Sequence, residues 1–162
     1  MILFNHIWIV FIIVTVFNAL VLKFRSQKYI KAKPELEPGY DKLVKGIIFY
    51  GNIPWVIVGI GNLSQYTTGL FDYLYLNTFN PFIIIFYISI LVIWLLAFYW
   101  IYFKQGAEFL IEHPGLIRVR DGGISGEITA KKIKIFVGLI LFSNMIMVLF
   151  LLYQINIAKL IR

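Results

Sequence analysis

The chain has 162 residues, of which 60% are hydrophobic and only 14% are charged, and its formal net charge is +7. Because a soluble domain carries about 25% charged residues, this composition and a mean hydropathy of +0.85 exclude an ordinary soluble globular domain and predict a polytopic helical membrane protein. The sequence contains no cysteine, which excludes disulfides, thiolate metal ligands and thiol nucleophiles.

Four apolar runs are long enough to cross a hydrocarbon core roughly 30 Å thick, which takes about 20 helical residues. Strands with open edges are excluded because lipid offers the backbone no hydrogen-bond partners. We therefore predict an all-α fold with a single four-helix domain over residues 1–162. The first run is expected to be a retained helix and not a signal peptide, because no basic residue precedes it and no small-residue cleavage site follows it. The predicted spans are 2–22, 46–63, 81–103 and 135–157.

Basic residues are concentrated in two of the loops. Residues 23–45 hold seven and residues 104–134 hold six, whereas residues 64–80 hold none. The positive-inside rule then predicts two cytoplasmic loops, with both termini outside, for an integral multi-pass protein of a bacterial inner membrane of cytoplasmic or thylakoid type. Contact with anionic lipid headgroups is expected, and no nucleic acid partner. The headgroup contacts are predicted at Lys23, Arg25, Lys28, Lys31, Lys33, Lys131, Lys132 and Lys134.

Two prolines divide the first basic loop. The first helix is expected to continue past residue 22, until Pro34 and Pro38 make further helix unfavourable. The sequence "PGYDKLVKGII" then restarts a helix, with Asp41 in its first turn, where the helix dipole favours an acid.

The second span lies within "YGNIPWVIVGIGNLS", which contains small and polar residues that a plain lipid anchor does not need. At 100° per residue these fall within roughly one 100° arc of the helix, and the opposite side, with Ile57, is expected to face lipid. Small residues allow close helix approach and asparagines can bond across helices, so the arc is predicted to be a packing surface. The alternative is a cavity or pore. The residues predicted to form this packing or pore surface, including one from the first span and one from the fourth, are Asn18, Gly51, Asn52, Trp55, Gly59, Asn62 and Asn144.

The third span begins at Pro81, a residue that suits the first turn of a helix. The loop before it, 64–80, is rich in aromatic residues typical of the membrane interface. The helix is expected to end at 103 or to extend through "KQGAEFLIEH" to 113. A small hairpin is compatible with residues 116–128, and Thr129 is predicted to cap the fourth helix.

One constellation is chemically suggestive. On a continued helix Glu108 and Glu112 share a face and His113 is adjacent, so that two carboxylates and an imidazole could hold a divalent ion or perform acid–base chemistry. The alternative is a solvated helix end with Lys104 near Glu108. The four spans contain no Asp, Glu, Lys or Arg, which argues against a proton relay or ion-coupled transport.

Several strings resemble a family of small bacterial four-helix integral-membrane proteins of unknown function. They are "FRSQKYI", "PELEPGYDKLVKG", "GNIPW" and "GAEFLIEHPGL". The resemblance covers most of the chain and implies no activity.

The sequence therefore predicts a protein that acts through helix packing, as an accessory or assembly component of a membrane complex. Its expected partners are the lipid bilayer and other membrane-protein subunits or further copies of itself. No enzymatic activity and no cofactor are expected. The first alternative is a homo-oligomeric channel lined by the asparagines, and the second is a membrane enzyme or metal site at Glu108, Glu112 and His113.

Overall fold

The computed structural model describes residues 6–74, 80–115 and 129–160, with side chains described up to residue 146. Within these ranges the chain is all-α, as predicted, and contains no strand. The possible hairpin at 116–128 lies outside the described residues. The elements are α2 (Ile7–Ala32), η1 (Pro34–Leu36), α3 (Glu37–Leu63), η2 (Leu70–Leu74), α4 (Pro81–Phe103), α5 (Gly106–Glu112) and α6 (Ala130–Leu160).

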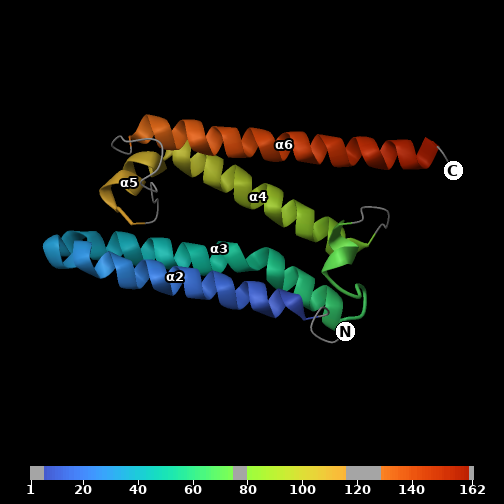
Figure 1. The fold of residues 1–162 in the computed structure, drawn as a ribbon, viewed down its shortest axis with the longest axis horizontal. Coiled ribbons are helices and arrows are strands. Elements are labelled where there is room, and N and C mark those ends of the chain that lie inside the picture. Colours follow the sequence, from blue (N-terminus) through green and yellow to red (C-terminus); the bar gives the residue numbers. More distant parts are fainter. Residues whose placement is uncertain (1–5, 75–79, 116–128, 161–162) are drawn as a thin grey trace, which may run out of the picture.

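The long helices form two pairs, of which the first is the more closely packed. Figure 1 shows α2 and α3 side by side and antiparallel, whereas α4 and α6 converge where α4 ends and α6 begins and then diverge, so that the start of α4 lies toward α3. The short helix α5 lies at the end of the molecule where α4 ends and α6 begins. The start of α2 and the end of α6 lie at the opposite end.

Three of the described helices are long and apolar enough to cross a membrane: α2, the segment Pro34–Leu63 that contains α3, and α4. By the length and composition of these helices, the chain is a multi-pass integral membrane protein. The fourth predicted span, 135–157, lies within α6. Because the side chains of α6 beyond residue 146 are outside the described part, its role as a span stays a prediction.

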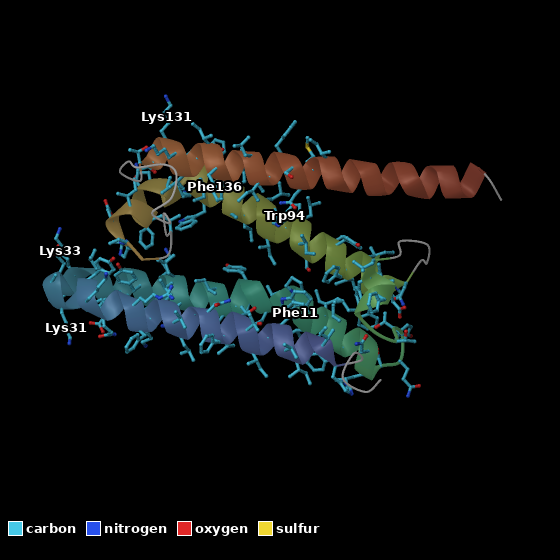
Figure 2. All side chains as sticks on the ribbon, viewed as in Figure 1. Phe11, Lys31, Lys33, Trp94, Lys131 and Phe136 are labelled. Carbon is cyan, nitrogen blue, oxygen red and sulfur yellow. The ribbon has the colours of Figure 1, made fainter. Side chains whose placement is uncertain are left out.

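The two basic loops lie at the same end of the molecule. Figure 2 shows Lys31, in the last turn of α2, and Lys33, directly after α2, at the same end as Lys131 at the start of α6. This arrangement agrees with the predicted alternation of loops. The side of the membrane that this end faces is still a prediction, which rests on the distribution of charge in the loops.

The first basic loop folds as two helices and a tight turn. Helix α2 continues to Ala32, and η1 begins at Pro34. Helix α3 restarts at Glu37, with Pro38 in its first turn, where a missing N–H costs nothing. It then continues through Pro54, which leaves the carbonyl of Tyr50 without its helical donor.

The third span does not extend to residue 113. Helix α4 begins at Pro81, as predicted, and ends at Phe103; α5 starts only at Gly106. Between them Gln105 takes a left-handed conformation, with φ of 55°. The helix is interrupted there, and Gly106 packs closely against Trp100: a Cβ on this glycine would lie 2.8 Å from the Trp100 carbonyl oxygen. This close approach was not evident from the apolar pattern.

Three small clusters of buried side chains hold the helices together. The first joins α3, η2 and α4 through Val58, Tyr73, Ile83 and Phe86. The second joins α4, α5 and α6 and consists of Ile101, Ala107, Leu110 and Ile133. The third joins α2 and α3 through Ala19, Leu22 and Val44.

Candidate functional site

The predicted arc of α3 faces α2. A Cβ on Gly51 would lie 2.8 Å from Cγ2 of Thr15, and one on Gly59 would lie 2.8 Å from the ring of Trp8. Between these glycines, Trp55 stacks on Phe11 with ring centroids 4.0 Å apart and planes 7° from parallel. The structure therefore brings Gly51, Trp55 and Gly59 together in a close contact with α2.

Two of the predicted asparagines, Asn52 and Asn144, bond to their own helices. The Nδ2 of buried Asn52 donates to the Ile48 carbonyl at 2.7 Å, and that of Asn144 to the Ile140 carbonyl at 2.9 Å. Both carbonyls lie four residues earlier on the same helix, within reach of a short amide side chain. Asn52 Oδ1 is buried without a partner among the described residues.

The other two asparagines are not part of one seam. The side-chain oxygen of Asn62 accepts a hydrogen bond from the Thr67 hydroxyl in the following loop. Asn18 is exposed on α2. The expected lipid-facing side of α3 also needs correction: Ile57 packs against the Val58–Ile83–Phe86 cluster toward α4, although Val56 and Ile60 on that side are exposed. Helix periodicity could not reveal that α3 has neighbours on two sides.

The loop after α3 is fastened to the ends of α3 and α4. Asn80 caps α4 by accepting from the Phe82 N–H at 3.0 Å, and its Nδ2 donates to the Tyr66 carbonyl at 2.6 Å. The Tyr87 hydroxyl donates to the Tyr73 carbonyl at 2.6 Å. Tyr73 is buried, and this burial raises the pKa of its hydroxyl. Sequence reasoning missed the role of Asn80, although an asparagine directly before a helix-starting proline is a capping signal.

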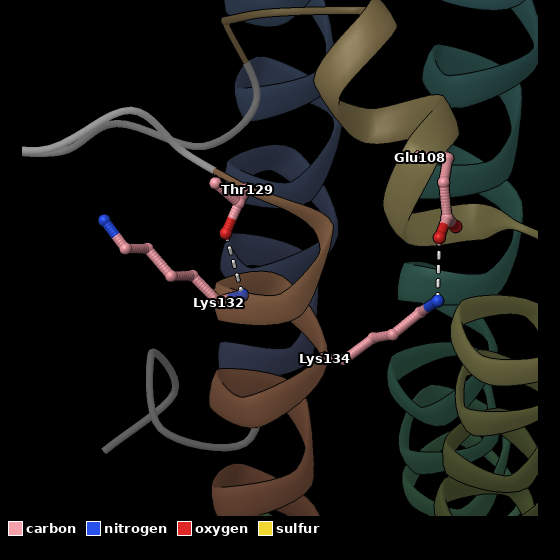
Figure 3. A network of polar contacts seen from close by, with 4 residues as sticks. All are labelled: Glu108, Thr129, Lys132 and Lys134. Carbon is pink, nitrogen blue, oxygen red and sulfur yellow. Dashed lines mark hydrogen bonds and ion pairs between the residues drawn. The ribbon is translucent and has the colours of Figure 1, made fainter.

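Glu108, Glu112 and His113 do not form a common site. Figure 3 shows Glu108 Oε1 accepting from Nζ of Lys134 on α6, at 2.7 Å. This hydrogen bond lowers the pKa of Glu108. The partner is Lys134, not the predicted Lys104. Glu112 is exposed. In the part of the chain that the structure describes, no group of three or more His, Asp or Glu residues can hold a metal ion.

His113 is instead a buried packing residue. Its Nδ1 lies 2.9 Å from the Phe109 carbonyl, and its Nε2 lies directly against Gly39 of α3. The ring stacks on Phe109 and contacts Tyr40 edge-on. The Nδ1 of His113 is thus engaged by its own helix and its ring is packed against α3, as in a packing residue.

The same junction contains a residue that the sequence analysis did not single out. Tyr40 is only 1% exposed, and its hydroxyl donates to the Pro114 carbonyl at 2.7 Å. Together with His113 this bond attaches the end of α5 to the start of α3. An aromatic residue in a first helical turn carried no signal for so distant a partner.

Most of the predicted headgroup contacts are exposed at the basic end. Lys23 lies 3.7 Å from Asp41, and Lys28 lies over the Tyr29 ring at 4.6 Å. Thr129 caps α6, as predicted, by accepting from the Lys132 N–H at 3.3 Å (Figure 3). Lys134 is partly buried by its contact with Glu108. The exposed members of the set are Lys23, Arg25, Lys28, Lys31, Lys33, Lys131 and Lys132.

A groove of about 590 Å³ lies between α3 and α4. Its α3 side runs from Lys42 to Gly51, and its α4 side from Ile93 to Lys104. Towards the η2 end the two helices meet in the Val58–Ile83–Phe86 cluster. Towards the basic end Phe109 of α5 also lines the groove. No predicted residue except Gly51 belongs to this groove, because it depends on the angle between the helix pairs.

No protein-family model matches the chain, and neither a curated protein nor a solved structure matches it. The resemblance to a bacterial four-helix family is therefore not supported beyond a small helical membrane protein.

Proposed function

We propose that the chain is an accessory or assembly component of a membrane complex, and that α6 carries its contact with the partner. The supporting observation is the way α6 is held. The described contacts of α6 with α4 and α5 lie near its start, where Ile133 is buried and the Tyr102 hydroxyl donates to the Lys134 carbonyl at 2.6 Å. Figure 1 shows the rest of α6 reaching past the start of α4.

The described part of α6 presents a broad apolar surface beyond that attachment. Ile135, Phe136, Leu139, Phe142 and Met145 are all more than half exposed. Helices associate in lipid through close van der Waals packing. Among the residues of α6 whose side chains are described, the contacts with the rest of the chain lie near its start, so this 31-residue helix is suited to pack further along its length against a partner helix.

The two alternatives receive no comparable support. A pore lined by the asparagines needs the arc of α3 to face a water-filled axis, whereas Gly51, Trp55 and Gly59 face α2. A metal site needs Glu108, Glu112 and His113 to converge, whereas no metal-holding group of three such side chains is found among the described residues and Glu108 pairs with Lys134.

Site-specific photocrosslinking tests the proposal. A photoreactive phenylalanine at Phe142 on α6 is expected to capture one heterologous membrane protein in intact membranes, identified by mass analysis. The same residue at Val14, an exposed position of α2, serves as the control and should capture no such protein.

Two results would contradict the accessory role. One is equal crosslinking from both positions, which would indicate random collision. The other is a monodisperse protein without heterologous partners after extraction in mild detergent. Crosslinking of Phe142 only to further copies of the chain would replace the accessory role by self-association.

A further inference from the structure

The groove between α3 and α4 has the chemistry of an amphiphile site. Its lining is apolar along most of its length, with Leu43, Ile47, Ile93 and Leu96 among the wall residues. Gly46 leaves part of the α3 side open, because a Cβ added there would have no atom within 4 Å. The volume of about 590 Å³ lies in the usual range of ligand sites, roughly 300–1,000 Å³.

The charged groups of the groove lie at one end only. Lys42 is near the start of α3 and Lys104 follows the end of α4, both at the basic end of the molecule. Among the described residues no carboxylate forms an ion pair with either lysine; the Nζ of Lys104 lies 5.7 Å from the Tyr99 ring centroid. The polar end of the groove therefore carries uncompensated positive charge.

The length of the groove matches one leaflet of a bilayer. Lys42 and Gly51 are nine residue steps apart along α3, and Ile93 and Lys104 are eleven steps apart along α4 and its C-cap. At 1.5 Å per residue these correspond to about 14 Å and about 16 Å. A hydrocarbon core is roughly 30 Å thick, so the groove extends from the basic membrane surface to about the midplane.

We propose that this groove binds one acyl chain of an anionic phospholipid, with the phosphate held between Lys42 and Lys104. The apolar walls suit the acyl chain and the two lysines suit the phosphate. The groove ends at about the depth in the membrane at which the acyl chain ends. A partner helix fits less well, because its diameter is about 10 Å and because α3 and α4 converge toward their cluster at the η2 end, away from the two lysines. The proposal does not depend on the accessory role, which concerns α6.

Native mass spectrometry of the purified full chain provides the test. The probes are phosphatidylglycerol, which is anionic, and phosphatidylcholine of the same chain length, which is zwitterionic. A lysine near the headgroups is worth about a fivefold preference for an anionic lipid, so two give roughly thirtyfold. We expect one tightly retained phosphatidylglycerol per chain, with a preference of that order.

Three variants separate the groove from the general basic surface. Lys42→Gln with Lys104→Gln should reduce the preference to nearly that of an uncharged site. Gly46→Leu should place a side chain in the groove and displace the lipid, without a clash at its Cβ. Lys45→Gln removes an exposed lysine of α3 that does not line the groove, and should leave the retained lipid in place.

Each contrary outcome is interpretable. Equal retention of the two lipids by the unaltered protein would overturn the proposal, as would a preference that survives the double lysine variant. Loss of preference in that variant with full retention in Gly46→Leu would show a surface headgroup contact and overturn the acyl-chain site. A doubled mass that Gly46→Leu abolishes would assign the groove to a second copy. The lysine variants keep the test decisive if Gly46→Leu fails to fold.

Discussion

Two glycines of α3 determine how closely α2 can approach. Gly51 lies against Thr15 and Gly59 against Trp8, so that the backbone of α3 itself forms the surface on which these side chains rest. The asparagine between them bonds to its own helix and adds little to the contact. The contact therefore depends on shape more than on hydrogen bonding. This is expected in lipid, where the hydrophobic effect does not drive helices together and close packing does.

Gly59→Leu should consequently destabilise the protein. The new Cβ would lie 2.8 Å from Trp8, and overpacking of this kind costs about 1–3 kcal/mol. Thermal aggregation in mild detergent measures the effect. The control Ile60→Leu changes an exposed neighbour and should stay within about 0.5 kcal/mol of the unaltered protein. A Gly59→Leu protein as stable as this control would refute the close α2–α3 contact.

At the scale of the element, α5 connects the two helix pairs at the basic end. Its inner face packs Ala107 and Leu110 against α4 and α6, while His113 at its end contacts Tyr40 of α3. The Glu108–Lys134 contact adds a charged connection from α5 to α6. A seven-residue helix is too short to be stable alone, so its conformation depends on these contacts.

The Glu108–Lys134 contact predicts a small pH dependence. The pKa of Glu108 is lowered in the folded protein, so its stabilisation is fully present above the unfolded pKa, about 4.3. It is lost as the pH falls through the lower folded pKa. The unaltered protein should therefore be slightly more thermostable than Glu108→Gln at pH 7, and this difference should shrink when the pH is lowered well below the unfolded pKa.

Glu112→Gln is the matched control for this experiment. Glu112 is exposed on the same short helix, and no ion pair is described for it. Its substitution should leave the thermal transition nearly unchanged at both pH values. A difference for Glu108→Gln that grows as the pH falls would have the wrong sign and would contradict the assigned contact.

At the scale of the whole molecule, two helix pairs place two basic loops at one end and the aromatic loop at the other. Lys31, Lys33 and Lys131 share one end (Figure 2), and the segment with η2 lies at the opposite end (Figure 1). The positive-inside rule predicts that this basic end lies in the cytoplasm. The groove would then open in the cytoplasmic leaflet.

Cysteine labelling tests this orientation without background, since the chain has no cysteine of its own. Single cysteines at Gln27 and Lys131 should be shielded from an impermeant thiol reagent in intact cells. One at Phe71, which is 62% exposed, should be labelled. Labelling of Gln27 and Lys131 but not Phe71 would reverse the orientation, and opposite results for Gln27 and Lys131 would contradict the shared basic end.

The sequence alone determined the features that depend on neighbouring residues. The apolar runs predicted helices where the structure has them, the prolines predicted the turn before α3, and Pro81 and Thr129 predicted two helix starts. The distribution of charge among the loops predicted that the two basic loops lie at the same end of the molecule. These signals are local because hydropathy, proline geometry and capping act within a few residues.

Only the tertiary structure decided which helix lies against which face. The arc of α3 was evident from periodicity, but that it faces α2 while Ile57 faces α4 was not. The helix interruption at Gln105, the burial of His113 and the groove beside Gly46 all arise from contacts between segments far apart in the chain. In lipid nearly every residue of a span is apolar whether it meets a helix or a lipid chain, so hydropathy cannot distinguish the two, and the packing of small and aromatic side chains decides.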